Sequence, residues 1–206
     1  MTTGLYAFDE QHRGAVVKLI AGVDEAGRGP LAGPVVAAAV VLNPAHEIDG
    51  VDDSKKLTAA YRHRLFYEIL YNALSIGIGI VEAPEIDRIN ILNATKSAKT
   101  EAVSDLNIRP DMLLIDALTL PAVACSQAAI IKGDTKSASI AAASIIAKHL
   151  RDSIMASVHE QYPQYNFIAH KGYGTKEHME RLEAYGPCAA HRKTFSPVSV
   201  LRLRFQ

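Results

Sequence analysis

Apolar residues along this chain occur mostly in short runs, and a polar or glycine-rich stretch separates one run from the next. Runs of this length that are rich in β-branched residues predict strands. The five predicted strands cover residues 18–23, 35–42, 74–82, 111–116 and 128–132. The third, LSIGIGIVE, alternates strictly between two faces, as a strand in a sheet does.

Helices are predicted between and after these strands. They cover residues 58–72, 83–106, as one or two helices, and 134–151. Residues 43–57 predict a polar loop, and the chain beyond residue 151 predicts short helices and loops. A hairpin pattern comes first and strand–helix crossovers follow, so we expect an α/β protein with a mixed sheet covered by helices.

Length and composition suit one domain, or one domain with a small appendage. The chain has 206 residues, of which 49% are hydrophobic and 21% charged, enough for a packed core. No window of about 18 apolar residues predicts a membrane span. The acidic start, MTTGLYAFDE, is unlike a secretory signal. Two distant cysteines, Cys125 and Cys188, argue against a disulfide framework, so we expect a reducing, cytoplasmic location.

Charge is distributed unevenly along the chain although the formal net charge is zero. Residues 1–131 carry 11 Lys and Arg against 16 Asp and Glu, whereas residues 132–206 carry 11 against 6. A basic C-terminal third could bind a polyanion such as a nucleic acid. An uneven set of solvated surface charges explains the same numbers.

Two common nucleotide-binding motifs are excluded. The spacing Gly27-x-Gly29-x-x-x-Gly33 does not match a dinucleotide-binding fingerprint, and a β-branched strand follows it where that fingerprint needs a helix. The sequence GxxxxGK[ST] of a P-loop is absent from the chain.

Four acidic residues, Asp24, Glu25, Asp116 and Asp134, lie at the ends of predicted strands, and Asp134 opens a predicted helix. Carboxylates that lie close together repel each other unless a cation separates them. Oxygen ligands suit Mg²⁺ or Mn²⁺, and such a cluster can hold two ions for phosphoryl transfer. Each acid alone also fits a turn residue or a helix cap, and chain position does not establish that the four converge.

Seven segments carry a family resemblance and reach from about residue 20 to 198. In chain order they are AGVDEAGRGPLAGPV (21–35), DSKKL (53–57), ID (115–116), GD (133–134), SIAAASIIAK (139–148), HKGYGT (170–175) and HRKTF (191–195). Together they resemble bacterial ribonuclease HII, the type 2 ribonuclease H. Type 3 enzymes carry a GTGDYFGP-like stretch where this chain has GRGPLAGP, which favours type 2.

The resemblance implies a ribonuclease H-like fold within one catalytic domain over residues 1–206, with a C-terminal helical extension from about residue 155. It implies a monomeric endonuclease that cuts RNA hybridised to DNA and single ribonucleotides embedded in DNA. The resemblance also makes Asp24, Glu25, Asp116 and Asp134 the catalytic ligands of two divalent ions, Mn²⁺ or Mg²⁺. Hydrolysis by two such ions leaves 3′-hydroxyl and 5′-phosphate ends.

Recognition of the ribose 2′-hydroxyl is assigned by the same resemblance to Gly27-Arg28-Gly29 together with Tyr173. Glycines let the backbone approach a ligand closely, and the 2′-hydroxyl is the group that distinguishes RNA from DNA. Tyr173 lies between two glycines and two residues after Lys171, which suits an exposed ring that stacks on a sugar or base. Without the resemblance, a tight turn explains Gly27-Arg28-Gly29 equally well, and a surface aromatic that covers a loop explains Tyr173 better.

Lys55 and Lys148 are candidates for contacts with substrate phosphates, although solvated lysines would look the same in the sequence. Arg151-Asp152 predicts a surface or capping pair, and His191-Arg192 offers further DNA contacts. The C-terminal SVLRLRFQ (199–206) predicts a strand or a short peptide motif.

Two other function classes remain at the level of sequence. Another nuclease of the same fold, such as a junction resolvase, would share the acids and need no 2′-hydroxyl sensor. A non-catalytic nucleic-acid-binding module would be expected to lack at least one of the four acids, and all four are present.

Overall fold

The structure is a computed structural model that describes residues 4–51, 57–201 and 203. At its centre lies a five-stranded sheet with the strand order β3-β2-β1-β4-β5. The strands are β1 (Ile20–Ala26), β2 (Val35–Val41), β3 (Ser75–Val81), β4 (Met112–Asp116) and β5 (Ser126–Ile130).

The sheet is mixed, as the sequence predicts. β1 and β2 pair antiparallel, as do β2 and β3, whereas β1 pairs parallel with β4 and β4 with β5. Strand β1 therefore lies in the middle of the sheet, with a hairpin on one side and crossover strands on the other. Most strand bounds differ from prediction by one to three residues. The largest differences are in β1, which starts two residues later and continues past the acids at 24 and 25 to Ala26, and in β5, which lies two residues earlier at both ends.

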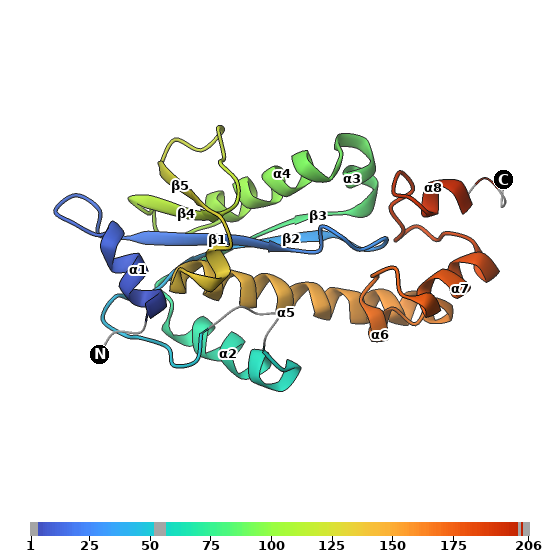
Figure 1. Ribbon diagram of the computed structural model, residues 1–206, viewed down its shortest axis with the longest axis horizontal. Coiled ribbons are helices and arrows are strands. Elements are labelled where there is room, and N and C mark those ends of the chain that lie inside the picture. The colour runs from blue at the N-terminus through green and yellow to red at the C-terminus, as the bar shows by residue number, and fades with distance from the viewer. Residues whose placement is uncertain (1–3, 52–56, 202, 204–206) are drawn as a thin grey trace.

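Helices cover both faces of the sheet (Figure 1). They are α1 (Gly4–His12), α2 (Ala59–Asn72), α3 (Ala83–Ile89), α4 (Ile91–Ser104), η1 (Gly133–Thr135), α5 (Ala138–Gln161), η2 (Pro163–Tyr165), α6 (Phe167–His170), α7 (Lys176–Tyr185) and α8 (Val198–Leu201). Helices α3 and α4 lie on one face, and α5 lies on the other with α2 outside it. The α/β architecture of a mixed sheet flanked by helices is thus confirmed.

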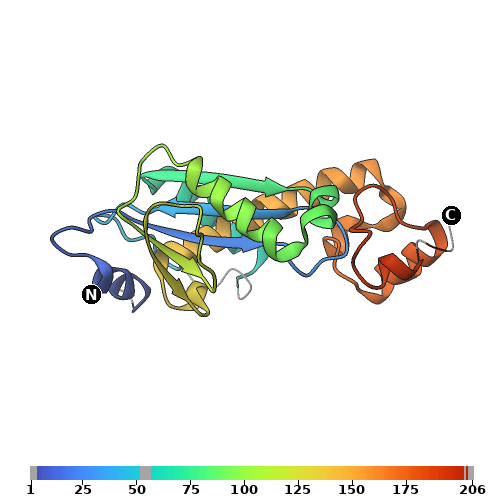
Figure 2. The same ribbon diagram turned by 90° about the horizontal axis from the view of Figure 1, so that it is seen from above.

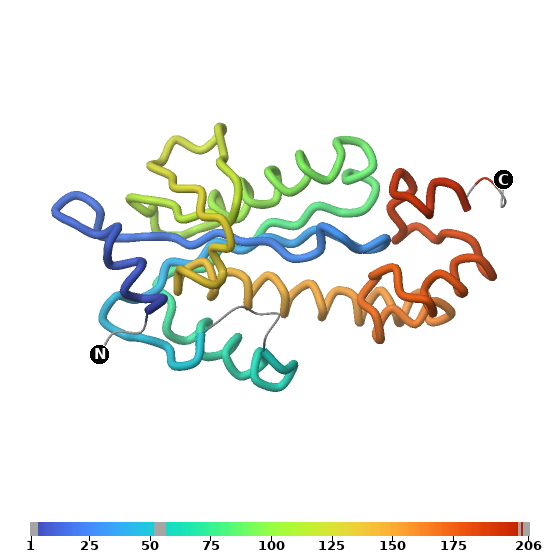
Figure 3. The backbone as a smooth tube through the Cα atoms, in the orientation of Figure 1, coloured from blue at the N-terminus to red at the C-terminus, as the bar shows by residue number. Residues whose placement is uncertain are grey.

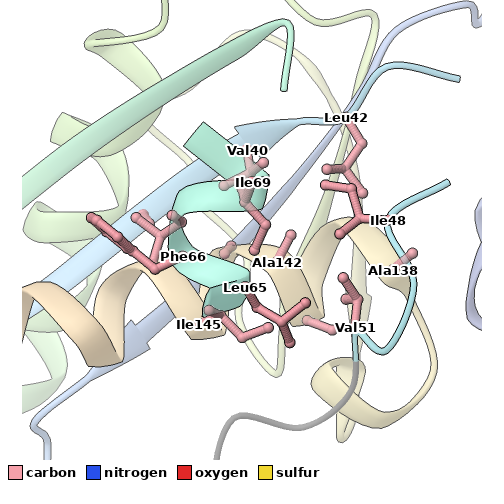
Figure 4. Packing of buried hydrophobic residues seen from close by; sticks show 14 of the residues in the cluster. Val40, Leu42, Ile48, Val51, Leu65, Phe66, Ile69, Ala138, Ala142 and Ile145 are labelled. Carbon is pink, nitrogen blue, oxygen red and sulfur yellow. The ribbon is translucent and has the colours of Figure 1, made fainter. Parts of the chain in front are cut away.

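The α5 face of the sheet carries an apolar core that joins β2, α5 and α2. Leu65 and Ile69 of α2 point toward Ala142 and Ile145 of α5 (Figure 4). Helix α5 comes unusually close to β1 at Gly22, where a Cβ atom would lie only 2.0 Å from the carbonyl carbon of Ser139. Any larger residue at this position would push α5 away from the central strand.

The opposite face is covered by α4, whose buried positions recur with helical spacing. They are Ala94, Thr95, Ala98, Lys99 and Ala102. One of these positions thus holds a lysine whose side chain is fully buried, although buried helix positions are normally apolar.

The long helix α5 differs from its predicted bounds at both ends. Its N-cap is Ser137, whose hydroxyl accepts a hydrogen bond from the amide of Ile140 at 3.2 Å, so the helix starts four residues after Asp134. It continues ten residues past Arg151 to Gln161, and Pro163 follows. Figures 2 and 3 trace it from the sheet toward α6, α7 and α8, which lie beyond one end of the sheet.

One terminal element, helix α1, was not anticipated. It packs near the start of α5, where buried Asp9 accepts hydrogen bonds from the amide (2.9 Å) and hydroxyl (2.7 Å) of Ser139. Residues 198–201 form the short helix α8, which agrees with the short helices predicted beyond residue 151, so the alternative of a strand is wrong for residues 199–201.

Candidate active site

Strand register brings two of the predicted acids together. Val23 of β1 lies beside Ile115 of parallel β4, and the next residues along the two strands are Asp24 and Asp116. Residues paired in this way in parallel strands project from the same face, here the face covered by α5. Glu25 projects from the other face toward α4, so the carboxylates surround the ends of β1 and β4.

A cavity of about 320 Å³ lies at this end of the strands. Eight of the ten residues predicted for the site line it: Asp24, Glu25, Gly27, Arg28, Gly29, Asp116, Lys148 and Tyr173. Its remaining lining residues are Ala26, Ser144 and Arg151. A larger depression of about 720 Å³ near α1 and residues 48–51 lies apart from these carboxylates.

Two predicted residues are not in this lining. Asp134 is buried in η1, directly after Gly133, whose amide donates a 2.8 Å hydrogen bond to Oδ1 of Asp116. Lys55 falls outside the described residues. Among the residues that the structure describes, no group of three or more His, Cys, Asp and Glu side chains is already gathered closely enough to hold a metal ion.

The carboxyl group of Asp24 is buried beside other carboxylates. Its burial, followed by the charges of Glu25 and Asp116, raises its pKa well above the usual range, while Lys99 acts in the opposite direction. Oδ1 of Asp24 accepts a 2.7 Å hydrogen bond from the amide of Glu25, which fixes the side chain. Crowded acids of this kind favour binding of a cation.

Glu25 lies between two cations. Nζ of Lys99 is 2.6 Å from Oε2, and a guanidinium nitrogen of Arg28 is 3.3 Å from Oε1. The lysine contact is an ion pair whose angles fall outside hydrogen-bond geometry, so buried Oε2 has no hydrogen-bond donor among the described residues. Lys99 was not among the predicted site residues, although its place in an alanine stripe of α4 is a signal in the sequence.

Backbone carbonyls of the 27–34 loop are held by two fully buried arginines. Arg192 donates to the carbonyl oxygens of Gly27, Arg28 and Gly33. Arg151 donates to those of Ala32 and Pro34, and also to that of Lys171. The predictions of Arg151 in a surface pair and of His191-Arg192 as DNA contacts are therefore wrong, because these side chains are buried and bonded internally.

Gly27 has a backbone conformation that only glycine adopts easily, with φ of +98°. A Cβ atom there would also lie 2.1 Å from Nε of Arg151. The glycine thus allows the loop to turn directly after β1 and to lie against the arginine that supports it.

Tyr173 is half-exposed at the edge of the cavity, and its ring lies against Gly29. A chain of buried imidazoles supports its backbone. Nδ1 of His191 lies 3.0 Å from the amide nitrogen of Cys188. Nε2 of His191 lies 3.1 Å from Nε2 of His178. Nδ1 of His178 in turn lies 2.9 Å from the carbonyl oxygen of Tyr173.

The proton positions in this chain follow from its two ends. The Cys188 amide can only donate and the Tyr173 carbonyl can only accept, so Nε2 of His191 and Nδ1 of His178 carry the protons. Burial lowers the pKa of His191 to about 3 and that of His178 to about 4, so both rings are neutral at pH 7. They therefore position the tyrosine and do not supply charge.

Lys148 projects from α5 into the cavity and is paired with Asp152, with Nζ 2.6 Å from Oδ1. Burial lowers its pKa, whereas Asp152 raises it. A substrate phosphate would have to share this ammonium with Asp152.

The chemistry of the donor set fits a hard divalent ion. Asp24, Glu25 and Asp116 present carboxylate oxygens to one cavity, and Oε2 of Glu25 already attracts a cation, the ammonium of Lys99. Oxygen ligands of this type are preferred by Mg²⁺ and Mn²⁺.

Comparison with known proteins identifies the family. The sequence profile of the family described as ribonuclease HII matches residues 21–200. Ribonuclease HII of Bacillus subtilis (strain 168) is 55% identical over 95% of this chain and 76% of its own length. That of Syntrophus aciditrophicus (strain SB) is 57% identical over 86% of this chain and 84% of its own length. The chain belongs to the ribonuclease HII family. It is therefore a ribonuclease H, a nuclease of the hydrolase class.

Solved structures agree with this assignment. The ribonuclease H2 of Pyrococcus horikoshii OT3 superimposes with a TM-score of 0.75 and 28% identity, over 91% of this chain and 99% of that chain. Bst-RNase HIII, solved in complex with Mn²⁺, has a TM-score of 0.66 and 19% identity over 94% of this chain and 71% of its own. At that identity the likeness establishes the fold alone.

In the described part of this family member, no helix is both long and apolar enough to cross a membrane.

Proposed function

We propose that this ribonuclease H cleaves the RNA strand of RNA–DNA hybrids and single ribonucleotides embedded in duplex DNA. One observation carries the proposal: the acids Asp24, Glu25 and Asp116 line the same cavity as Gly27-Arg28-Gly29 and Tyr173. A group that can hold metal ions is thus next to a glycine-rich segment and an exposed ring, the two features that suit recognition of one ribose.

Asp24, Glu25, Asp116 and Asp134 are the proposed metal ligands, for Mn²⁺ or Mg²⁺. Two divalent ions bound there would activate the attacking water and stabilise the leaving 3′-oxygen, giving 3′-hydroxyl and 5′-phosphate ends. The protein's part is to hold these carboxylates at the ends of adjacent strands. Asp134 belongs to the set because the amide of neighbouring Gly133 is already bonded to Asp116.

Substrate binding is proposed for Gly27-Arg28-Gly29, Tyr173, Lys148 and Lys55, the last on family resemblance alone. Arg192 holds the carbonyl oxygens of Gly27 and Arg28, so the loop is ordered before substrate arrives. Such preorganisation lowers the entropic cost of aligning a 2′-hydroxyl with the backbone. Lys148 would contact a phosphate as a point charge.

We infer that residues 1–206 form one catalytic domain with a C-terminal helical extension from about residue 155, and that it acts as a monomer. One observation supports the single domain. Helix α5 runs without interruption from the sheet to the C-terminal helices.

The test of this proposal is hydrolysis of a uniform RNA–DNA hybrid by the metal-free protein, with added EDTA, Mg²⁺ or Mn²⁺. We expect no cleavage with EDTA and multiple-turnover cleavage of the RNA strand with either ion. An all-DNA four-way junction serves as the control substrate. Cleavage of the junction and not of the hybrid would favour the junction resolvase and refute the proposed function.

A further inference from the structure

Lys99 is a charged residue on the buried face of α4, in contact with Glu25 of the candidate active site. Its side chain is fully buried, and its Nζ is 2.6 Å from Oε2 of Glu25. The same ammonium donates a 2.9 Å hydrogen bond to the backbone carbonyl of Asp116. One cation thus connects the ends of β1 and β4, the two strands that carry the acids.

Core packing alone does not explain a lysine at this position. Its neighbours on the buried stripe of α4 include Ala98 and Ala102. Burying an ammonium requires loss of its hydration, and an apolar side chain of similar volume would pack there at lower cost. The partners of Lys99 indicate what offsets this cost, because both belong to the carboxylate site.

Lys99 and Arg28 differ in how firmly they hold Glu25. The side chain of Arg28 is 45% exposed, whereas that of Lys99 is 0% exposed. Arg28 can therefore turn toward solvent or substrate, but the ammonium of Lys99 stays beside Glu25. A divalent ion that bound Oε2 would have to approach this fixed positive charge.

We propose that Lys99 is the resident counter-ion of the carboxylate site. Its fixed charge holds Asp24, Glu25 and Asp116 together before a divalent ion binds, and it weakens divalent binding by repulsion and by competition for Oε2 of Glu25. Lys99 is thus a positioning residue that acts through the carboxylates. This inference rests on the proposed metal site.

The test is titration of the metal-free full chain with Mn²⁺ by calorimetry. Lys99→Met removes both charge and hydrogen bond, whereas Lys99→Gln removes the charge and keeps a donor for the Asp116 carbonyl. We expect the Kd for Mn²⁺ to fall by about tenfold in both variants, because one repulsive unit charge near the ion is lost. Lys99→Arg keeps the charge and should leave the Kd within about twofold of wild type.

Thermal unfolding gives a second readout. Without Lys99 the metal-free carboxylates repel each other more strongly, so Lys99→Gln should lower the Tm of the metal-free protein. Saturating Mn²⁺ should then raise its Tm by more than it raises that of wild type. The matched control is Lys96→Met, which removes a lysine from the same helix outside the cavity lining and should leave the Kd for Mn²⁺ unchanged.

A Kd for Mn²⁺ that stays within twofold of wild type in folded Lys99→Gln would overturn the inference. If Lys99→Met does not fold, the comparison of Lys99→Gln with Lys99→Arg decides the question alone. Failure of the proposed metal site has a different signature: wild type would bind no Mn²⁺, or Asp24→Asn would bind it as tightly as wild type does.

Discussion

Replacement of Asp24 by asparagine is expected to lower kcat on an RNA–DNA hybrid by about 10³-fold at saturating Mg²⁺. The amide keeps the shape of the side chain and can still accept the hydrogen bond from the Glu25 amide. What it loses is the negative charge that holds a divalent ion at the end of β1. Steady-state hydrolysis of a labelled hybrid measures the effect.

The same substitution, Asp24→Asn, should raise the thermal stability of the metal-free protein although it lowers kcat. Because burial and neighbouring carboxylates raise the pKa of Asp24, its ionised form destabilises the folded, metal-free protein as the pH rises above the unfolded-state pKa. The neutral amide removes that penalty, so the Tm at pH 7 should rise by about 2–4 °C, the shift that 1 kcal/mol gives at this size. Glu183→Gln on exposed α7 is the control. Near-full turnover by Asp24→Asn would contradict the proposed metal site.

Replacement of Tyr173 by alanine is expected to reduce kcat/KM on a duplex with a single ribonucleotide by about tenfold or more, the magnitude of one lost stacking contact. A uniform hybrid should lose much less. The ring lies at the cavity edge against Gly29 and can pack on the deoxyribose that follows the ribonucleotide. A ribose there would place an additional hydroxyl against the ring, so we expect a preference for the RNA-to-DNA junction.

Two variants separate stacking from other causes. Tyr173→Phe keeps the ring and should retain most activity on both substrates. Tyr71→Ala removes a tyrosine that is 90% exposed on α2 and should have no effect on either substrate. Equal losses on both substrates in Tyr173→Ala would contradict the role in junction recognition and leave a structural role for the aromatic ring.

The strand pattern indicated where the acids of this site lie, because residues at the ends of neighbouring strands are close together in the fold. Once β1 and β4 are recognised as parallel neighbours, Asp24 and Asp116 must lie side by side. The glycines around Arg28 and Tyr173 indicated close backbone approach, and both segments line the cavity.

The buried cations could not be predicted in the same way. Arg151 and Arg192 are charged residues in polar stretches, and their partners include carbonyl groups more than 100 positions away in sequence, at Ala32 and Gly33. Every residue has a backbone carbonyl, so residue types do not indicate which carbonyl accepts these hydrogen bonds. Lys99 did have a local signal, its place in an alanine stripe, but its partner Glu25 lies on another element.

The start of α5 was misplaced for a local reason. Residues 133–135 form a 3₁₀ turn after Lys132, which has a left-handed backbone with φ of 56°. Asp134, predicted as the first residue of the helix, therefore belongs to a separate turn, and Ser137 provides the N-cap of α5. Serine and aspartate are both good N-caps, and composition alone did not distinguish them.

The proposed function is cleavage of a phosphodiester bond, with metal ions held by the carboxylates, at a ribose that the adjacent loop recognises. Its most direct test is incubation of wild-type protein and Mg²⁺ with a DNA duplex that contains one ribonucleotide, beside an all-DNA duplex of the same sequence. We expect one cut beside the ribonucleotide that leaves a 3′-hydroxyl and a 5′-phosphate, and no cut in the all-DNA duplex. Cleavage of both duplexes, or 2′,3′-cyclic phosphate ends, would contradict the account.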